Sequence, residues 1–181
     1  QTALDETAGR LNPADNPWHG LVRAHVGDNG EPALDVFEGH GDLVALDHSA
    51  DETVDYVVHV MSHWLDRGAA GWRLDAAYAV PSPFWARVLP QVKAAHPYSW
   101  IFGEVIHGDY PRIIEESTMD SITQYELWKS IQHALETENF FELDWNLKRH
   151  NAFLDSFVPQ TFIGNHDVTR IASQIGPAKA A

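Results

Sequence analysis

Short apolar runs alternate with longer amphipathic segments from residue 47 onward, and this alternation constrains the fold more than any other feature. Four runs have the length and composition of β-strands: 71–75, 100–104, 121–125 and 160–164. The segments between them carry apolar side chains at helical spacing. Strands that alternate with helices predict a parallel sheet with right-handed crossovers. We therefore expect an α/β fold over residues 47–181.

The helices of this pattern have recognisable ends. Gly68, Pro97 and Pro159 each stop a helical segment. We expect helices that begin at Ser49 or Asp51, at Pro81, near Arg112, at Glu126, at Leu143 (running to Phe157) and at Val168. Residues 1–46 show neither the helical nor the strand periodicity of apolar residues clearly, and they are rich in turn signals. We therefore expect a loop-rich region with a few short strands, of which Leu21–Val26 is the best candidate.

Charged side chains stand where several of these strands end. Arg73 and Asp75 are two residues apart, so on a strand they face the same way, and Glu104 ends the next strand. Functional side chains at the carboxyl ends of several strands are typical of a (β/α)₈ barrel. No strand is followed by a Gly-rich phosphate loop, so a nucleotide-binding open sheet has no support. Because a full barrel takes about 250 residues, we expect only part of one.

The composition excludes several classes of function. The formal net charge is −14, from 26 acidic and 12 basic residues, which argues against nucleic acid or an anionic membrane surface as partner. The absence of cysteine excludes disulfides, thiolate metal sites and a cysteine nucleophile, while eleven histidines leave a His/Asp metal site open. No apolar run has the length of a membrane helix. We expect a cytoplasmic protein whose own N-terminus precedes residue 1.

Three motifs at strand ends carry a family resemblance. Gly71-Trp72-Arg73-Leu74-Asp75-Ala76-Ala77, Gly103-Glu104-Val105 and Phe162-Ile163-Gly164-Asn165-His166-Asp167 resemble signature regions of the α-amylase family of glycoside hydrolases, in the family's order. Gly41-Asp42-Leu43-Val44-Ala45-Leu46-Asp47 resembles its shorter motif near the end of the inserted B domain. Because three motifs coincide with strand ends in this order, the resemblance to the family is specific.

The resemblance implies a fold and its division. It implies a (β/α)₈ TIM barrel, here partial with about strands 4 to 7, preceded by part of an irregular inserted B domain. Residues 1–46 would be the B-domain portion and 47–181 the partial catalytic barrel. The family's signature at the end of strand three has no counterpart here. We therefore expect that the remaining barrel strands, or another chain, are needed to complete the fold.

The resemblance also implies a chemistry. Retaining glycoside hydrolysis needs two carboxyl groups about 5–5.5 Å apart, one a nucleophile and one a proton donor. Asp75 would be the nucleophile, held ionised and aimed by Arg73, and would form a covalent glycosyl-enzyme. Glu104 follows the apolar run 100–103, which would desolvate its carboxyl group and favour the protonated form of a general acid. The glycine at position 103 would leave space there for substrate.

Other residues would bind the substrate, an α-linked glucoside such as a malto-oligosaccharide. Asp167 and His166 would hold sugar hydroxyls as the ring flattens, Tyr78 could stack on a sugar face, and His107 could line the cleft beyond Glu104. Many family members have Lys-His where this chain has Tyr78-Ala79, so a backbone calcium ligand is not supported there. We expect no cofactor and assign no metal ligand.

Three alternatives remain open from the residues. A metal-dependent barrel hydrolase would bring His and Asp ligands together, although no His-x-His occurs. A non-catalytic member of the same fold would not need all three carboxylates. A piece with an unclosed barrel would be inactive by itself, because an open sheet exposes its edges. The covalent intermediate is shared by hydrolysis and transglycosylation, and nothing in these residues chooses between them.

Overall fold

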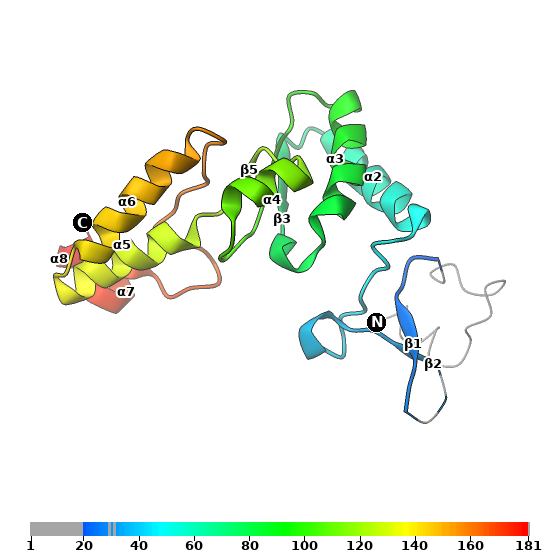
Figure 1. Ribbon diagram of the computed structural model, residues 1–181, viewed down its shortest axis with the longest axis horizontal. Coiled ribbons are helices and arrows are strands. Elements are labelled where there is room, and N and C mark those ends of the chain that lie inside the picture. Colours follow the sequence, from blue (N-terminus) through cyan, green and yellow to red (C-terminus); the bar gives the residue numbers. More distant parts are fainter. Residues whose placement is uncertain (1–19, 29, 31, 181) are drawn as a thin grey trace. The chain divides into compact units, whose positions relative to one another are not determined.

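A computed structural model describes residues 20–28, 30 and 32–180 of the chain (Figure 1). The chain forms two compact units, one ending at Met61 and the other beginning at Ser62. Much of the region 1–46 therefore lies outside the described residues, and its assignment as B domain stays a prediction.

The first unit contains a small antiparallel sheet. Strand β1 (Ala24–Val26) pairs with β2 (Pro32–Leu34). The predicted strand Leu21–Val26 is thus shorter than expected, and Val22 makes only an isolated bridge to Leu46. A 3₁₀ turn, η1 (Phe37–Gly39), follows the sheet.

Helix α2 (Asp51–Leu65) crosses from the first unit into the second. The carboxylate of Asp47 accepts a hydrogen bond from the backbone N–H of Ser49 at 2.9 Å, which shapes the turn before the helix. Gly68 adopts a φ of 98° and donates its N–H to the carbonyl of Leu65 at 3.0 Å, so the helix ends where the sequence predicts.

The second unit contains a parallel sheet in the order β3-β4-β5. Its strands are β3 (Gly71–Leu74), β4 (Trp100–Gly103) and β5 (Ser121–Ile122). Both pairings are parallel. The structure therefore confirms three of the four predicted strands and their direction, although β5 is shorter than predicted because Tyr125 already begins a helix.

The fourth predicted strand, 160–164, is wrong beyond its first residue. Gln160 makes a parallel bridge to Thr123, donating to the carbonyl of Ile122 at 2.9 Å and accepting from Gln124 at 3.0 Å. After that residue the chain leaves the sheet. The ring of Phe162 packs edge-on against Tyr125, with centroids 4.8 Å apart, so this apolar run is used in an aromatic cluster rather than in strand pairing.

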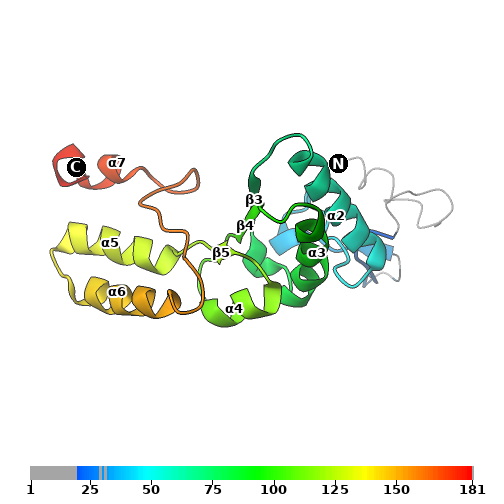
Figure 2. The same ribbon diagram turned by 90° about the horizontal axis from the view of Figure 1, so that it is seen from above.

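Helical segments lie between the strands of this unit and after its last strand. They are η2 (Ala77–Ala79), α3 (Ser82–Ala95), α4 (Tyr110–Ser117), α5 (Tyr125–Thr137), α6 (Phe141–Phe153), α7 (Ile171–Ile175) and α8 (Pro177–Ala180). Helices α5 and α6 run antiparallel and side by side (Figure 2). The predicted helices are present with shifted ends; α6 begins and ends earlier than predicted, and the last begins at Ile171 instead of Val168.

Within the described residues, no helix is both long and apolar enough to cross a membrane.

The core of the second unit draws on residues of both α3 and the sheet. Val88, Leu89 and Val92 of α3 are fully buried, as are Ile101 of β4 and Ile122 of β5. Residues 88, 89 and 92 lie on one face of the helix, which is the face the apolar spacing predicts. The buried residues of β4 and β5 anchor the strands whose carboxyl ends carry the residues of interest.

Gly71 gives a first testable prediction, because it has no room for a side chain. A Cβ atom at this position would lie 1.9 Å from the backbone oxygen of Trp100 on the paired strand. We expect Gly71→Ala to push β3 and β4 apart and to lower the free energy of unfolding by more than about 3 kcal/mol. Gly41→Ala is the matched control, because a Cβ there meets nothing within 4 Å. Denaturant melts of the full-length variants measure the difference, and equal midpoints would contradict the pairing described.

Candidate active site

Arg73 and Asp75 form the centre of the site at the end of β3. Arg73 Nη1 donates a hydrogen bond to Asp75 Oδ1, so the two side chains face the same way, as the strand alternation predicts. Asp75 lies just past the strand and its side chain is 77% exposed, whereas that of Arg73 is 28% exposed. The carboxylate is thus held from one side and open to solvent on the other.

The same guanidinium contacts two more carboxylates. Its Nη2 lies 2.9 Å from Glu104 Oε1 and 3.7 Å from Asp167 Oδ2. Burial lowers the pKa of Arg73, but the hydrogen bond to Asp75 and the negative charges around it raise the pKa overall above its ordinary value. Arg73 therefore stays charged and holds together three carboxylates that are far apart in the sequence.

The backbone around Glu104 is fixed by its neighbours. Its N–H donates to the carbonyl of Leu74 at 2.9 Å, and its carbonyl accepts from Tyr78 at 3.2 Å. The next residue, Val105, is held by Thr123, whose hydroxyl accepts from the Val105 N–H at 2.9 Å and donates to its carbonyl at 3.0 Å. Every strand of the parallel sheet thus contributes to the position of this glutamate.

The Glu104 side chain is only 10% exposed and receives several hydrogen bonds. The N–H of Ala76 donates to Oε2 at 3.0 Å, and the Tyr125 hydroxyl donates to Oε1 at 2.9 Å. Ala76 has a φ of 44°, a conformation that residues other than glycine rarely adopt. Such strain is common where a structure must aim a backbone group at a functional site.

Tyr125 and Asn165 are site residues that the sequence did not predict. Asn165 Nδ2 donates to the Tyr125 hydroxyl at 2.7 Å, and its Oδ1 accepts from the backbone N–H of Asp167 at 3.0 Å. Tyr125 is the last residue of the third predicted strand, 121–125, so its place at a strand end could have indicated a site residue. Asn165 lay inside the third motif without an assigned role.

The space predicted beside Gly103 is not available to a substrate. A Cβ atom at this position would lie 2.6 Å from the sulfur of Met119 and 2.9 Å from Cβ of Ala77. The glycine is therefore required for close packing of β4 against these side chains, and the prediction that it leaves room for a sugar is wrong.

The other predicted substrate-binding residues, His166, Tyr78 and His107, are all exposed. His166 Nε2 lies 3.4 Å from Asp167 Oδ2, and its side chain is 67% exposed. Tyr78 is 40% exposed, in the turn η2 that follows Asp75. His107 is exposed in the loop after β4 and is not one of the side chains that Arg73 contacts. Their roles in substrate binding stay predictions.

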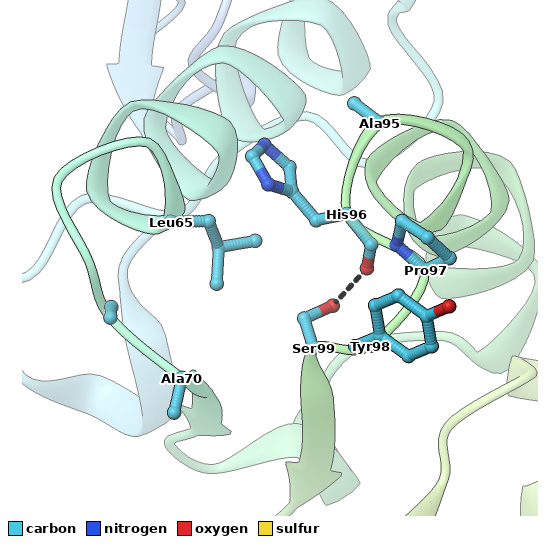
Figure 3. A pocket seen from close by; sticks show the side chains of 8 residues that line it. Leu65, Ala70, Ala95, His96, Pro97, Tyr98 and Ser99 are labelled. Carbon is cyan, nitrogen blue, oxygen red and sulfur yellow. Dashed lines mark hydrogen bonds between the residues drawn. The ribbon is translucent and has the colours of Figure 1, made fainter.

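A separate hollow of about 450 Å³ lies at the opposite end of β3 and β4. Its lining comes mainly from the loops that precede these two strands, and Ser99 closes one side by donating to the carbonyl of His96 at 2.8 Å (Figure 3). Because the strands are parallel, this end is remote from the carboxylates. Across the described part of the chain, no group of three or more His, Cys, Asp and Glu side chains is arranged to hold a metal ion.

A maltogenic α-amylase and a cyclomaltodextrinase are among the known proteins that resemble this chain. The maltogenic α-amylase of Bacillus acidopullulyticus is 27% identical over 151 residues, which cover 80% of this chain and 26% of that protein. A cyclomaltodextrinase from a Bacillus species is 30% identical over 98 residues, or 54% of this chain and 17% of that protein. This chain therefore spans about a quarter or less of the length of these curated relatives.

Solved structures agree with these relatives in fold. A cyclic α-maltosyl-(1→6)-maltose hydrolase from Arthrobacter globiformis, in complex with cyclic α-maltosyl-(1→6)-maltose, superposes with a TM-score of 0.78 at 20% identity. The alignment covers 97% of this chain and 41% of that one, so this chain has the fold of part of such an enzyme. Residues 34–181 match the family described as the α-amylase catalytic domain, and the chain belongs to the α-amylase family.

Proposed function

We propose that the protein hydrolyses α-linked glucosides, such as malto-oligosaccharides, with retention of anomeric configuration. The observation that carries this proposal is the contact of one guanidinium, that of Arg73, with the carboxylates of Asp75, Glu104 and Asp167. Carboxylates that contact the same guanidinium lie near one another, which a site that acts on a single sugar ring requires. The names of the relatives, a maltogenic amylase and a cyclomaltodextrinase, support an α-glucan as the substrate class.

The environments of two carboxyl groups suggest different roles. Asp75 is mostly exposed and is held by Arg73, so its carboxylate is oriented and reachable, as a nucleophile must be. Glu104 is nearly buried, which suits a group that carries a proton to the leaving oxygen. Asp167 and His166 lie beside this pair and would hydrogen-bond the sugar hydroxyls, most strongly as the ring flattens.

The reaction has two steps. In the first, an oxygen of Asp75 attacks the anomeric carbon, the bond to the leaving oxygen breaks, and Glu104 donates its proton to that oxygen. In the second, the Glu104 carboxylate removes a proton from water, the water oxygen bonds to the anomeric carbon, and the bond to Asp75 breaks. Attack by a sugar hydroxyl instead of water would give transglycosylation. These steps need no cofactor.

The proposed catalytic domain is larger than the part described. Within the described residues, β3 pairs with β4 alone, and the free edge of β3 would accept a preceding strand of a (β/α)₈ barrel. On this proposal β3, β4 and β5 are strands four, five and six, and the rest of the protein supplies the others. Residues 1–46 would belong to the inserted B domain.

The configuration of the first product tests the proposed reaction. We expect the full-length protein to release the α-anomer of the new reducing sugar from maltotriose, because two inversions at the anomeric carbon restore the original configuration. Proton NMR during the first minutes distinguishes the anomers before they equilibrate. A β-anomer as the first product would show a single displacement by water and would exclude Asp75 as a covalent nucleophile.

A further inference from the structure

Glu104 is reached by a chain of two hydrogen bonds whose direction can be assigned. Asn165 Oδ1 accepts from the N–H of Asp167, so its amide nitrogen faces Tyr125 and donates to the phenol oxygen at 2.7 Å. The phenol hydrogen is then left to point at Glu104 Oε1, 2.9 Å away. The order of donation is therefore Asn165 to Tyr125 to Glu104.

The Tyr125 ring is fixed by its surroundings. Tyr125 is only 6% exposed, and the rings of Phe162 and Trp128 pack edge-on against it, with centroids 4.8 and 5.8 Å away. Burial, followed by the hydrogen bond to Glu104, raises the pKa of Tyr125 above its ordinary value. The phenol therefore keeps its hydrogen throughout the pH range in which a glycosidase works.

The two oxygens of Glu104 have different partners. Oε1 accepts from the Tyr125 hydroxyl at 2.9 Å and forms an ion pair with Arg73, whose Nη2 also lies 2.9 Å away, so a proton on this oxygen would be opposed by a positive charge. Oε2 accepts from the N–H of Ala76 at 3.0 Å, its one hydrogen-bond partner within the residues that the structure describes, and retains a lone pair that a proton can occupy. The carboxyl group can therefore carry its proton on Oε2 without losing any of these hydrogen bonds.

We propose that Tyr125 and Asn165 are positioning residues that hold Glu104 with its proton on Oε2, directed at the leaving oxygen. This inference rests on the proposed function, in which Glu104 is the general acid. Tyr125 acts on the carboxyl group directly, and Asn165 acts through Tyr125. Neither residue touches the reacting atoms of the substrate in this mechanism.

The two hydrogen bonds that run from Asn165 to Tyr125 and from Tyr125 to Glu104 form a relay. Tyr125→Phe tests this relay, because it removes the hydroxyl and keeps the packed ring. For maltotriose we expect kcat of the full-length protein to fall about tenfold to a hundredfold, the range expected for loss of a hydrogen bond to a charged group. KM should change by less than about twofold, because the residue does not bind substrate. For p-nitrophenyl α-glucoside the loss should be smaller, because its leaving group needs little help from an acid. Tyr98→Phe is the matched control, since Tyr98 is 98% exposed at the other end of the strands.

The pH profile distinguishes this role from a purely structural one. The Tyr125 hydroxyl stabilises the charged carboxylate, so its removal makes Glu104 keep its proton to higher pH. We expect the alkaline limb of the kcat/KM profile to move up by roughly half a unit to one unit in Tyr125→Phe. An unchanged alkaline limb together with unchanged leaving-group dependence would overturn the relay.

Asn165→Asp provides a second test, and its effect as a single variant does not depend on the stability of Tyr125→Phe. The new carboxylate can still accept from the N–H of Asp167, but its second oxygen accepts from the Tyr125 hydroxyl and turns it away from Glu104. We expect a fall in kcat for maltotriose similar to that of Tyr125→Phe, and a much smaller effect of Asn165→Asp when Tyr125→Phe is already present. Fully additive effects in the double variant would contradict the relay.

Glu104→Gln separates failure of this inference from failure of the proposed function. If Glu104→Gln abolishes turnover of maltotriose while Tyr125→Phe and Asn165→Asp behave as the parent protein does, the relay is wrong and the proposed function stands. If Glu104→Gln leaves turnover unchanged, the assignment of Glu104 as general acid is wrong, and the proposed relay is wrong as well.

Discussion

Asp75→Asn is expected to abolish turnover of both maltotriose and p-nitrophenyl α-glucoside by the full-length protein. An amide oxygen is too weak a nucleophile to displace the leaving group. The amide is also neutral, so it no longer forms an ion pair with Arg73. We expect kcat to fall by a factor of about 10⁴ or more, which corresponds to roughly 5 kcal/mol of transition-state stabilisation. Initial-rate measurements with both substrates give this factor directly.

Two controls show whether Asp75→Asn acts by unfolding the protein, and whether the loss is specific to this carboxylate. Asp75 is 77% exposed, so the substitution should leave the thermal midpoint within a few degrees of the parent's. Asp155→Asn changes an exposed carboxylate in the turn after α6 and should leave kcat unchanged. If Asp75→Asn retained more than about a tenth of the parent's kcat, the nucleophile of the proposed mechanism would have to be another group.

The strand ends were predictable because they depend on local sequence. Arg73 and Asp75 are two residues apart on a strand, so their common direction depends on backbone geometry alone. The apolar run before Glu104 likewise predicts a strand that carries this residue to its end, and the structure has both. Side-chain directions set by the period of a strand could therefore be obtained without a structure.

Features that depend on distant residues could not be predicted in this way. The hydrogen bond from Asn165 to Tyr125 joins residues forty positions apart, and no spacing rule indicates it. The apolar run that contains Phe162 fits both a strand and an aromatic cluster, and only the position of the Tyr125 ring decides between them. Gly103 likewise needed the structure, because Met119 fills the space that its missing side chain leaves.

The common partner of the carboxylates also lies beyond local sequence reasoning. A sequence can place Asp75, Glu104 and Asp167 at strand or loop ends, but it does not show that one arginine contacts all three. This contact has a consequence for variants: removal of one carboxylate leaves Arg73 with the other two. Effects of double substitutions in this group should therefore be strongly non-additive.

Glu104→Gln is expected to affect substrates according to their leaving groups. The glutamine oxygen can still accept from Tyr125 and lie beside Arg73. Its –NH2 group faces the N–H of Ala76 and cannot act as an acid toward the leaving oxygen. With maltotriose, whose leaving group is a sugar hydroxyl, we expect kcat/KM to fall about 10³-fold. With p-nitrophenyl α-glucoside, whose leaving group departs as a stable phenolate, the first step should slow far less.

The second step should then become limiting for the aryl glucoside, because water has lost its general base. Glycosyl-enzyme would accumulate, and mass spectrometry of a protease digest should find the added hexose on the peptide that contains Asp75. Added azide, which needs no base, should restore turnover of the aryl glucoside but not of maltotriose. Glu115→Gln, on the exposed face of α4, should show none of these effects. Equal losses for the two substrates, without an accumulated adduct, would show that Glu104 is not the acid and base of this reaction.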